Sequence, residues 1–378
     1  MFLSSLKAFN SKSKYMKKIL ISVVVIIVIV LAIVFGTKSE NGVSSTSKPI
    51  VIGAVISQTG YAAVDGMNIK NGMDMAVNDL RAEGVNVKIA YEDDGTDPMQ
   101  SVSAINKLIA TEKPDVLMGP IWSFLIDAAL PVINTNKIVT FIPSSSSEVV
   151  NATSSYIFYG TYKNMEEIVP LANFLKENNL NKIAIVVSND SWGESQYIPF
   201  TEVAKMANGS VVVNEKINYG TDKDVIPTIV TKIIKSKTDV VLWTGYDEGG
   251  TIIIKKLQEQ GYTGTVVVGG SVMRGLVNRG TVTLRATDKV YSINIPMDPA
   301  FRAKYIATYK QEPGISADSA YDGVKILVKG IQAGKTGIEL SNYLRDGFTY
   351  KGYLGTYDFD SKGDIVGGLW TIDRLIKQ

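Results

Sequence analysis

Two segments of the sequence carry clustered hydroxyl groups that could hold a carboxylate. The segments are GPIWS at residues 119–123 and PSSSS at residues 143–147, and each follows a short apolar run typical of a buried strand. Serine hydroxyls and backbone N–H groups at adjacent strand ends can bind an anion without a formal positive charge. The alternative is that these serines only cap helices and fill turns. The candidates for ligand contact are Trp122, Ser123, Ser144, Ser145 and Ser146.

A second set of side chains could form the opposite wall of a ligand cleft. Trp192 follows one of the later apolar runs, and Tyr246, Asp247 and Glu248 follow another. Aromatic faces and carboxylates are groups that can meet a ligand ammonium. Packing inside a core is the competing explanation for the aromatic residues. The sequence therefore predicts a cleft whose first wall is hydroxyl-rich and whose second wall is aromatic and acidic.

The absence of two residue types excludes much chemistry. The 378 residues include no Cys and no His, which removes thiolate nucleophiles, thiolate or imidazole metal ligands and the usual general base. The acidic run at residues 92–97 lacks the spacing of an EF-hand, and residues 330–336 are one residue too short for a phosphate loop. No Gly-x-Ser-x-Gly elbow occurs either. We therefore expect no metal, no cofactor and no enzymatic activity.

The first 47 residues differ in composition from the rest. Residues 1–18 form a basic tail, and residues 19–35 are 17 residues with Ser22 as the one polar side chain. At about 1.5 Å per residue, such a helix nearly spans a hydrocarbon core of roughly 30 Å. Five lysines precede it, so the positive-inside rule predicts a cytoplasmic N-terminus and an extracytoplasmic body. We expect an uncleaved single-pass anchor followed by a flexible tether at residues 36–47, with a cleaved signal peptide as the alternative.

The charge of the body makes nucleic acid a poor partner. Residues 1–47 hold six lysines and one glutamate, so residues 48–378 carry 33 basic and 36 acidic side chains. A body of this charge has no general basis for gripping phosphate backbones. The expected partners are a small molecule and a membrane, the latter through the N-terminal helix.

The body alternates short Val/Ile-rich runs with amphipathic segments, which is the pattern of parallel sheets covered by helices. The alternation continues long enough for two open sheets, so we expect an α/β fold with two Rossmann-like lobes. Residues 350–369 break the pattern and indicate extended chain that turns at residues 360–363. A closing hairpin or a return crossing between the lobes would explain this segment. The predicted strands are Ile50–Ile56, Val85–Tyr91, Asp115–Met118, Ile138–Ile142, Lys182–Val187, Val211–Ile217, Val240–Thr244, Thr265–Val268 and Lys289–Ile293.

Eight stretches in order resemble the leucine/isoleucine/valine-binding proteins of ABC importers, which have the type I periplasmic binding protein fold. The resemblance implies three crossing strands that act as a hinge, near Tyr162, Ile293 and Gly355. It also implies that residues 48–162 and 294–355 form lobe 1, and residues 163–293 and 356–378 form lobe 2. The stretches are IGAVISQTGYAAVDGMNIKNGMDMAVNDL, YEDDGTDPMQSVSAINKLI, VLMGPIWS, FIPSSSS, IAIVVSNDSWGES, TDKDVIPTIVTKIIKSKTDVVLWTGY, SAYDGVKIL and GYLGTYDFDSKGD.

The resemblance assigns roles to several candidates. Ser123, Ser144 and Ser146 fall where the family holds the ligand α-carboxylate, and Trp192 and Tyr246 fall where its second lobe supplies aromatic contacts. One departure concerns the acid that pairs with the ligand ammonium, because this chain has Ser271 near that position. Asp247, Glu248 or Asp65 could substitute for it, or the ligand could lack an α-amine. The ligand class thus stays open among amino acids, amides, urea-like compounds, short peptides and small carboxylates.

The resemblance implies a receptor that binds solute outside the cytoplasm and delivers it to an ABC permease in the membrane. The alternative is the sensing ectodomain of a signalling receptor, which uses the same fold. A cytoplasmic tail of 18 residues is too short for a catalytic output domain, so signalling would require a partner protein. The sequence does not identify the ligand, the permease, the affinity or the oligomeric state.

Overall fold

The structure is a computed structural model that describes residues 48–146, 148, 154–218, 222–269, 276–277 and 280–375. The described body forms one compact unit that begins at Pro49. The predicted tail, anchor and tether at residues 1–18, 19–35 and 36–47 lie outside the described residues. Within the described ranges, no helix combines the length and the apolar character needed to cross a membrane.

The first lobe is built on a parallel sheet of five strands in the order β2-β1-β3-β4-β5. The apolar runs explain the arrangement, because strands covered on both faces have few polar positions. All residues of β1 after Ile50 are buried. The strands are β1 Ile50–Ile56, β2 Val87–Asp93, β3 Val116–Met118, β4 Thr140–Ile142 and β5 Ile157–Tyr159.

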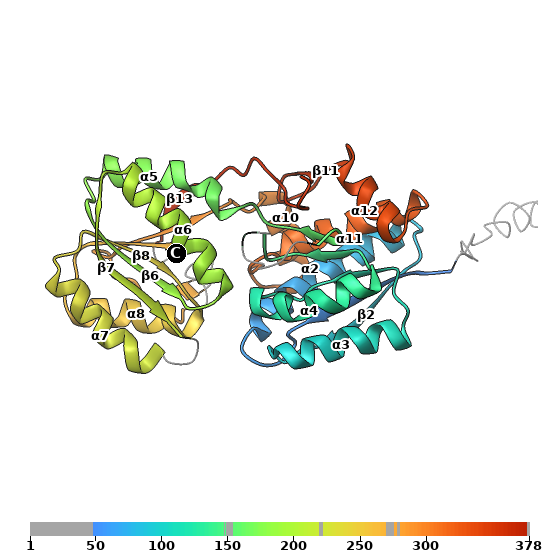
Figure 1. Cartoon of the computed structure of the whole chain (residues 1–378), viewed down its shortest axis with the longest axis horizontal. Coiled ribbons are helices and arrows are strands. Elements are labelled where there is room, and N and C mark those ends of the chain that lie inside the picture. Colours follow the sequence, from blue (N-terminus) through green and yellow to red (C-terminus); the bar gives the residue numbers. More distant parts are fainter. Residues whose placement is uncertain are drawn as a thin grey trace, which may run out of the picture. The chain divides into compact units, whose positions relative to one another are not determined.

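Helices from two separate parts of the chain cover this first sheet (Figure 1). One core cluster lies under α2 and α11, which pack closely against each other, and a second lies under α3 and α4. The later helices therefore belong to the first lobe although they follow the second sheet in sequence. The helices are α2 Ala63–Ala82, α3 Pro98–Thr111, α4 Ser123–Asn136, α10 Pro299–Tyr309, α11 Ala317–Gln332 and α12 Gly337–Arg345.

The second lobe contains a sheet in the order β13-β10-β9-β8-β6-β7, in which β13 runs antiparallel to β10. Its two faces are also covered, α5 and α6 on one side and α7 and α8 on the other (Figure 1). The strands are β6 Lys182–Ser188, β7 Ser210–Ile217, β8 Val240–Thr244, β9 Thr265–Gly269, β10 Lys289–Asn294 and β13 Thr371–Arg374. The helices are the 3-10 helix η2 Asn164–Glu167, α5 Ile168–Glu177, α6 Ser191–Met206, α7 Asp222–Lys235 and α8 Asp247–Glu259.

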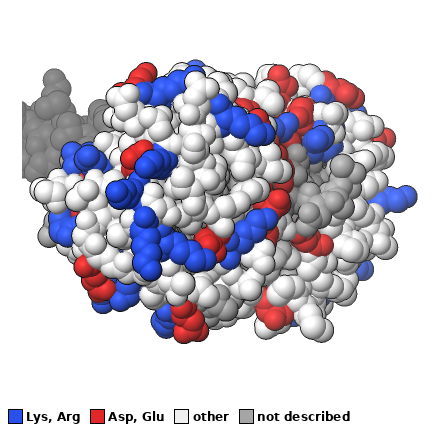
Figure 2. Space-filling model, turned by 60° about the vertical axis from the view of Figure 1, so that its left-hand side comes forward, with Lys and Arg blue, Asp and Glu red and all other residues white. Residues whose placement is uncertain are grey.

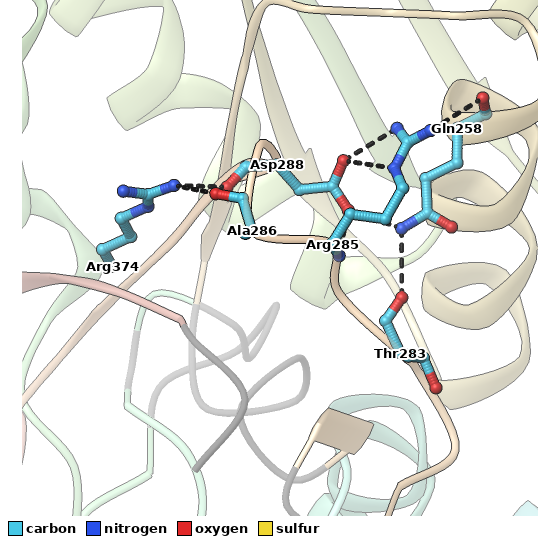
Figure 3. A network of polar contacts seen from close by, with 6 residues as sticks. All are labelled: Gln258, Thr283, Arg285, Ala286, Asp288 and Arg374. Atoms are coloured by element: carbon cyan, nitrogen blue, oxygen red, sulfur yellow. Dashed lines mark hydrogen bonds and ion pairs between the residues drawn. The ribbon is translucent and has the colours of Figure 1, made fainter.

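A polar network fastens the edge of the second sheet (Figure 3). The Arg374 guanidinium donates from β13 to the carbonyl of Asp288, at 3.1 Å, and to that of Ala286. Arg285 pairs with the Asp288 carboxylate, and Gln258 of α8 donates to the other oxygen of that carboxylate at 2.6 Å. The last strand, the segment before β10 and helix α8 are therefore joined by side-chain hydrogen bonds as well as by the sheet.

The chain crosses between the lobes three times, after β5, after β10 and before β13. The third crossing comes after Ile365 and not near Gly355 as predicted. The reason is that β11 Thr349–Lys351 and β12 Thr356–Asp358 form a hairpin on the first lobe, where Tyr357, Phe359 and Ile365 are buried in its core. Residues 356–378 were predicted to belong to lobe 2. Within this segment, the described strand that joins the second sheet is β13.

Candidate functional site

Two loops meet at the carboxyl end of the first sheet because β3 and β4 are neighbouring parallel strands. The loop after β3 begins at Gly119, whose φ is +81° and whose peptide bond to Pro120 is cis. A Cβ at Gly119 would lie 2.0 Å from the carbonyl oxygen of Val55, so β1 leaves no room for a side chain there. The loop after β4 is tied to the first loop, since the Ser144 hydroxyl donates to the carbonyl of Ile121.

Ser123 is the first residue of α4 and lies at this junction. Its side chain is buried, and within the described part of the chain its hydroxyl has no hydrogen-bond partner. The N-terminus of a helix also offers backbone N–H groups and a partial positive charge. Ser145 and Ser146 are buried in the adjoining loop. The structure thus brings Ser123 and Ser144 together at the start of α4, and Ser145 and Ser146 follow Ser144 in the same loop.

The side chain before Ser123 points toward an acid of the first lobe. Trp122 is the N-cap residue of α4, and its indole N–H donates to Asp65 Oδ2 at 3.2 Å. Asp65 lies in the first turn of α2. Both side chains are half-buried. An aromatic ring and a carboxylate, both among the candidate residues, are therefore joined at the start of α4.

The predicted aromatic residues of the second lobe also lie together. The rings of Trp192, in the first turn of α6, and Tyr246, the N-cap of α8, are 5.2 Å apart in an edge-to-face arrangement. The Tyr246 hydroxyl donates to the carboxylate of Asp190. Asp190 also caps α6, since its other oxygen accepts from the Gly193 N–H at 2.9 Å. The acid that holds Tyr246 is thereby fixed by the helix that carries Trp192.

Aromatic side chains bring the two lobes into contact beside the candidate residues. The rings of Trp122 and Tyr246, from opposite lobes, have centroids 4.6 Å apart. Trp192 packs against core clusters of both lobes. Candidate residues of both lobes, Trp122 from the first and Trp192 and Tyr246 from the second, therefore meet in one aromatic group.

Two predicted residues cannot be placed. Ser271 lies outside the described residues, and so does the side chain of Asp247, whose backbone starts α8. The neighbouring Glu248 is described, and it reaches the other lobe by accepting a hydrogen bond from the Tyr61 hydroxyl at 3.0 Å. Tyr61 was not a candidate, because nothing in its local sequence indicates a partner that lies 187 positions away.

The described charges near the site are mostly negative. Asp65, Asp127, Asp190 and Glu248 all lie in it or at its edge, and the ammonium of Lys223 lies 2.7 Å from Glu248. The hydrogen bond from Lys223 holds the pKa of Glu248 below its usual range. On the molecular face in Figure 2, basic and acidic side chains are interspersed and separated by uncharged areas.

A buried acid lies next to the hinge and was missed in the sequence. Glu167 ends η2 directly after the first crossing, its side chain is fully buried, and Gln196 of α6 donates to Oε1. Its Oε2 has no partner among the described residues. Burial, reinforced by the charge of Glu148, raises the pKa of Glu167 well above its ordinary value. Only the three-dimensional structure reveals this burial, since the local sequence Met-Glu-Glu is typical of an exposed turn.

No site for a metal ion is recognisable in the described ranges, where acidic side chains do not gather in groups of three or more suited to bind one. The hydrogen-bond donors at the site are hydroxyls, backbone N–H groups and the indole N–H of Trp122, and aromatic rings lie beside them. These groups can bind an organic anion and its apolar part by hydrogen bonds and van der Waals contact.

Two sheet-based lobes joined by three crossings define a type I bilobal binding fold. The chain belongs to the periplasmic binding protein family, whose model matches residues 49–370. It is similar to the Leu/Ile/Val-binding protein BraC3 of Rhizobium johnstonii, with 24% identity over 84% of this chain and 89% of that relative.

Two solved structures are similar in fold. The LivJ substrate-binding protein of Streptococcus pneumoniae, in complex with isoleucine, has a TM-score of 0.74 and 21% identity over 87% of this chain and 96% of its own. A solute-binding protein of an ABC transporter from Rhodopseudomonas palustris, in complex with 3,4-dihydroxybenzoic acid, has a TM-score of 0.75 and 20% identity over 86% and 93%. At this level of identity the likeness shows the shared fold.

Proposed function

We propose that this protein is the solute-binding component of an ABC importer and that it binds a small carboxylate with an apolar or planar body. The observation that carries the proposal is Ser123, a buried hydroxyl that lacks a partner in the described chain and that starts α4 beside a serine loop. A buried hydroxyl without a hydrogen bond lowers the stability of the protein. A ligand oxygen that accepts a hydrogen bond from Ser123 removes this cost and so favours binding.

The aromatic group is suited to the rest of such a ligand. Trp122 lies within the first serine loop, and Tyr246 of the second lobe contacts both Trp122 and Trp192, so flat apolar rings from both lobes gather beside the serines. Flat rings accommodate a branched aliphatic chain or an aromatic ring, which are the ligand bodies found in the two similar structures. The serines would hold the carboxylate, while Asp65 or Asp247 would accept a hydrogen bond from an amine or hydroxyl group of the ligand. Ser271, in place of the family's usual acid, makes an α-amine optional.

The proposed location of the protein and its proposed permease partner rest on the family and on the sequence. The body would lie outside the cytoplasm, attached by the predicted single-pass helix at residues 19–35, and would pass its ligand to a permease in the membrane. Ligand binding would be reversible, with no chemical turnover, because no nucleophile and base pair occurs among the candidate residues. Bending at the three crossings would open and close the site, which is the hinge motion by which periplasmic binding proteins close around their ligands.

A calorimetric titration of the full chain in mild detergent tests the proposal. The probes are isoleucine, leucine and 3,4-dihydroxybenzoate. We expect saturable binding of at least one of these acids and at least roughly tenfold weaker binding by Ser123→Ala, because a hydrogen bond to a charged group contributes about 1.5–3 kcal/mol.

The matched control is Ser103→Ala, which removes an exposed serine hydroxyl from α3 that bonds only within its own helix, to Met99. Equal binding by the parent and Ser123→Ala, with Ser103→Ala also unchanged, would show that the serine loops do not hold the carboxylate.

A further inference from the structure

Two hydrogen bonds connect the lobes outside the serine loops. The Tyr61 hydroxyl donates to Glu248 Oε2 at 3.0 Å, and the Ser191 hydroxyl donates to Asp127 Oδ2 at 2.6 Å. In each pair one residue comes from the first lobe and the other from the second. We call Tyr61–Glu248 and Ser191–Asp127 the latch pairs.

The first latch pair is oriented from within each lobe. Tyr61 lies in the loop between β1 and α2, and its ring contacts Trp122 edge to face at 6.3 Å. Glu248 is the second residue of α8, and its Oε1 is held at 2.7 Å by the ammonium of Lys223 from α7. The carboxylate is therefore already in position when the Tyr61 hydroxyl arrives, so little side-chain entropy is lost when the pair forms.

The second latch pair lies at the helices that carry the predicted site residues. Asp127 is one turn after Ser123 on α4, and Ser191 is the first residue of α6, directly before Trp192. Any rotation that separates α4 from α6 must break this hydrogen bond. The Ser191–Asp127 hydrogen bond therefore opposes the motion that opens the site.

We propose that the latch pairs stabilise the closed arrangement of the lobes in the absence of ligand and thereby set the apparent affinity without touching the ligand. The physical basis is that a ligand bound only by the closed state has an apparent dissociation constant equal to its intrinsic value divided by the closed fraction. The statement about affinity rests on the proposed function, whereas the statement about the closed fraction does not.

The experiment measures the distance between the lobes in the full chain in mild detergent. The chain lacks cysteine, so Asn106→Cys on α3 and Lys255→Cys on α8, both at exposed positions, supply two unique sites for spin labels. Double electron–electron resonance then gives the closed and open populations before any ligand is added. The test variants are Tyr61→Phe, Ser191→Ala and the two combined.

The control is Tyr197→Phe, which removes a hydroxyl that accepts from Asn214 within the second lobe. We expect the ratio of closed to open molecules to fall by roughly threefold in each single variant, because one hydrogen bond makes a modest contribution. The two latch pairs share no residues, so their effects should multiply to about tenfold in the double variant. Tyr197→Phe should leave the ratio unchanged.

The outcomes separate this proposal from the proposed function. An unchanged ratio in the double variant, or a ligand-free parent with no closed molecules, would overturn the latch whatever the acids do. The ratio of closed to open molecules could fall in the double variant while isoleucine, leucine and 3,4-dihydroxybenzoate all fail to bind. This result would support the latch and reject the proposed ligand class. Where an acid does bind, its apparent dissociation constant should rise in the double variant in proportion to the lost closed fraction.

Discussion

Asp322 should make the first lobe less stable as the pH rises. It lies on α11, and burial raises its pKa to about 7 from an ordinary 3.8. The folded state therefore binds a proton more tightly than the unfolded chain does. The free energy of unfolding contributed by this proton is fully present below about pH 4 and is lost as the pH rises to about 7. A difference of about three pKa units corresponds to about 4 kcal/mol.

The structure also contains the competing effect. Asp322 accepts hydrogen bonds from the Tyr353 N–H at 3.0 Å, the Leu354 N–H at 2.9 Å and the Tyr357 hydroxyl at 3.1 Å. Donors of this kind favour the ionised carboxylate and lower its pKa. Burial and the nearby Asp318 act in the opposite direction, and burial is the larger influence. The pH dependence of stability decides between them.

The assay is urea unfolding of the parent and of Asp322→Asn at several values between pH 4 and pH 8. Asparagine loses one acceptor for a backbone N–H, which lowers the stability of the variant by an amount that does not depend on pH. The test is therefore how the difference in stability between the parent and the variant changes with pH, and not the size of that difference at any one pH. The parent should lose up to about 4 kcal/mol more than the variant between pH 4 and pH 7. Parallel curves would refute the reasoning and show that the three donors keep Asp322 ionised throughout.

Two further predictions concern the site and the hinge. Gly119→Ala should destabilise the protein by more than about 2 kcal/mol in thermal unfolding, since its Cβ would overlap the Val55 carbonyl. Gly84→Ala, at φ +83° with open space around it, is the control and should cost about 1 kcal/mol; similar losses in both would contradict the steric argument. Glu167→Gln should gain stability relative to the parent as the pH rises from 5 to 8, because burial raises the pKa of Glu167 and its ionisation weakens the fold. A difference in melting temperature that is the same at both pH values would contradict this prediction.

The local pattern of the sequence predicted the strands because buried parallel strands need continuous apolar runs. The strands β1 and β8 have the predicted bounds. The strand β2 begins at Val87 and not at Val85, since its register is set by pairing with Ile50 of β1. The strand β4 is shorter than predicted, because its start at Thr140 is set by pairing with neighbouring strands. Boundaries of this kind depend on partners and not on local composition.

Features that depend on distant partners could not be predicted. The predicted turn at residues 360–363 exists, with the Gly363 N–H donating to the Asp360 carbonyl at 2.9 Å. A closing hairpin was one of two interpretations of residues 350–369, but the β11–β12 hairpin lies before this turn, between residues 349 and 358, and the observed position of the third crossing was not predicted. The serine loops were predictable because the carboxyl ends of parallel strands meet at one edge. The Tyr61–Glu248 pair was not, because it forms only when two separately folded lobes approach each other.

Replacing the carboxylate of a bound acid with an amide tests the central claim most directly. Whichever of isoleucine and 3,4-dihydroxybenzoate binds the full chain, its primary amide should bind at least roughly tenfold more weakly in the same titration, because the amide loses charge-assisted hydrogen bonds to the serine loops. Equal binding of the acid and its amide, or no binding of either acid, would contradict the claim that hydroxyls and helix N–H groups of the first lobe grip an anionic head group.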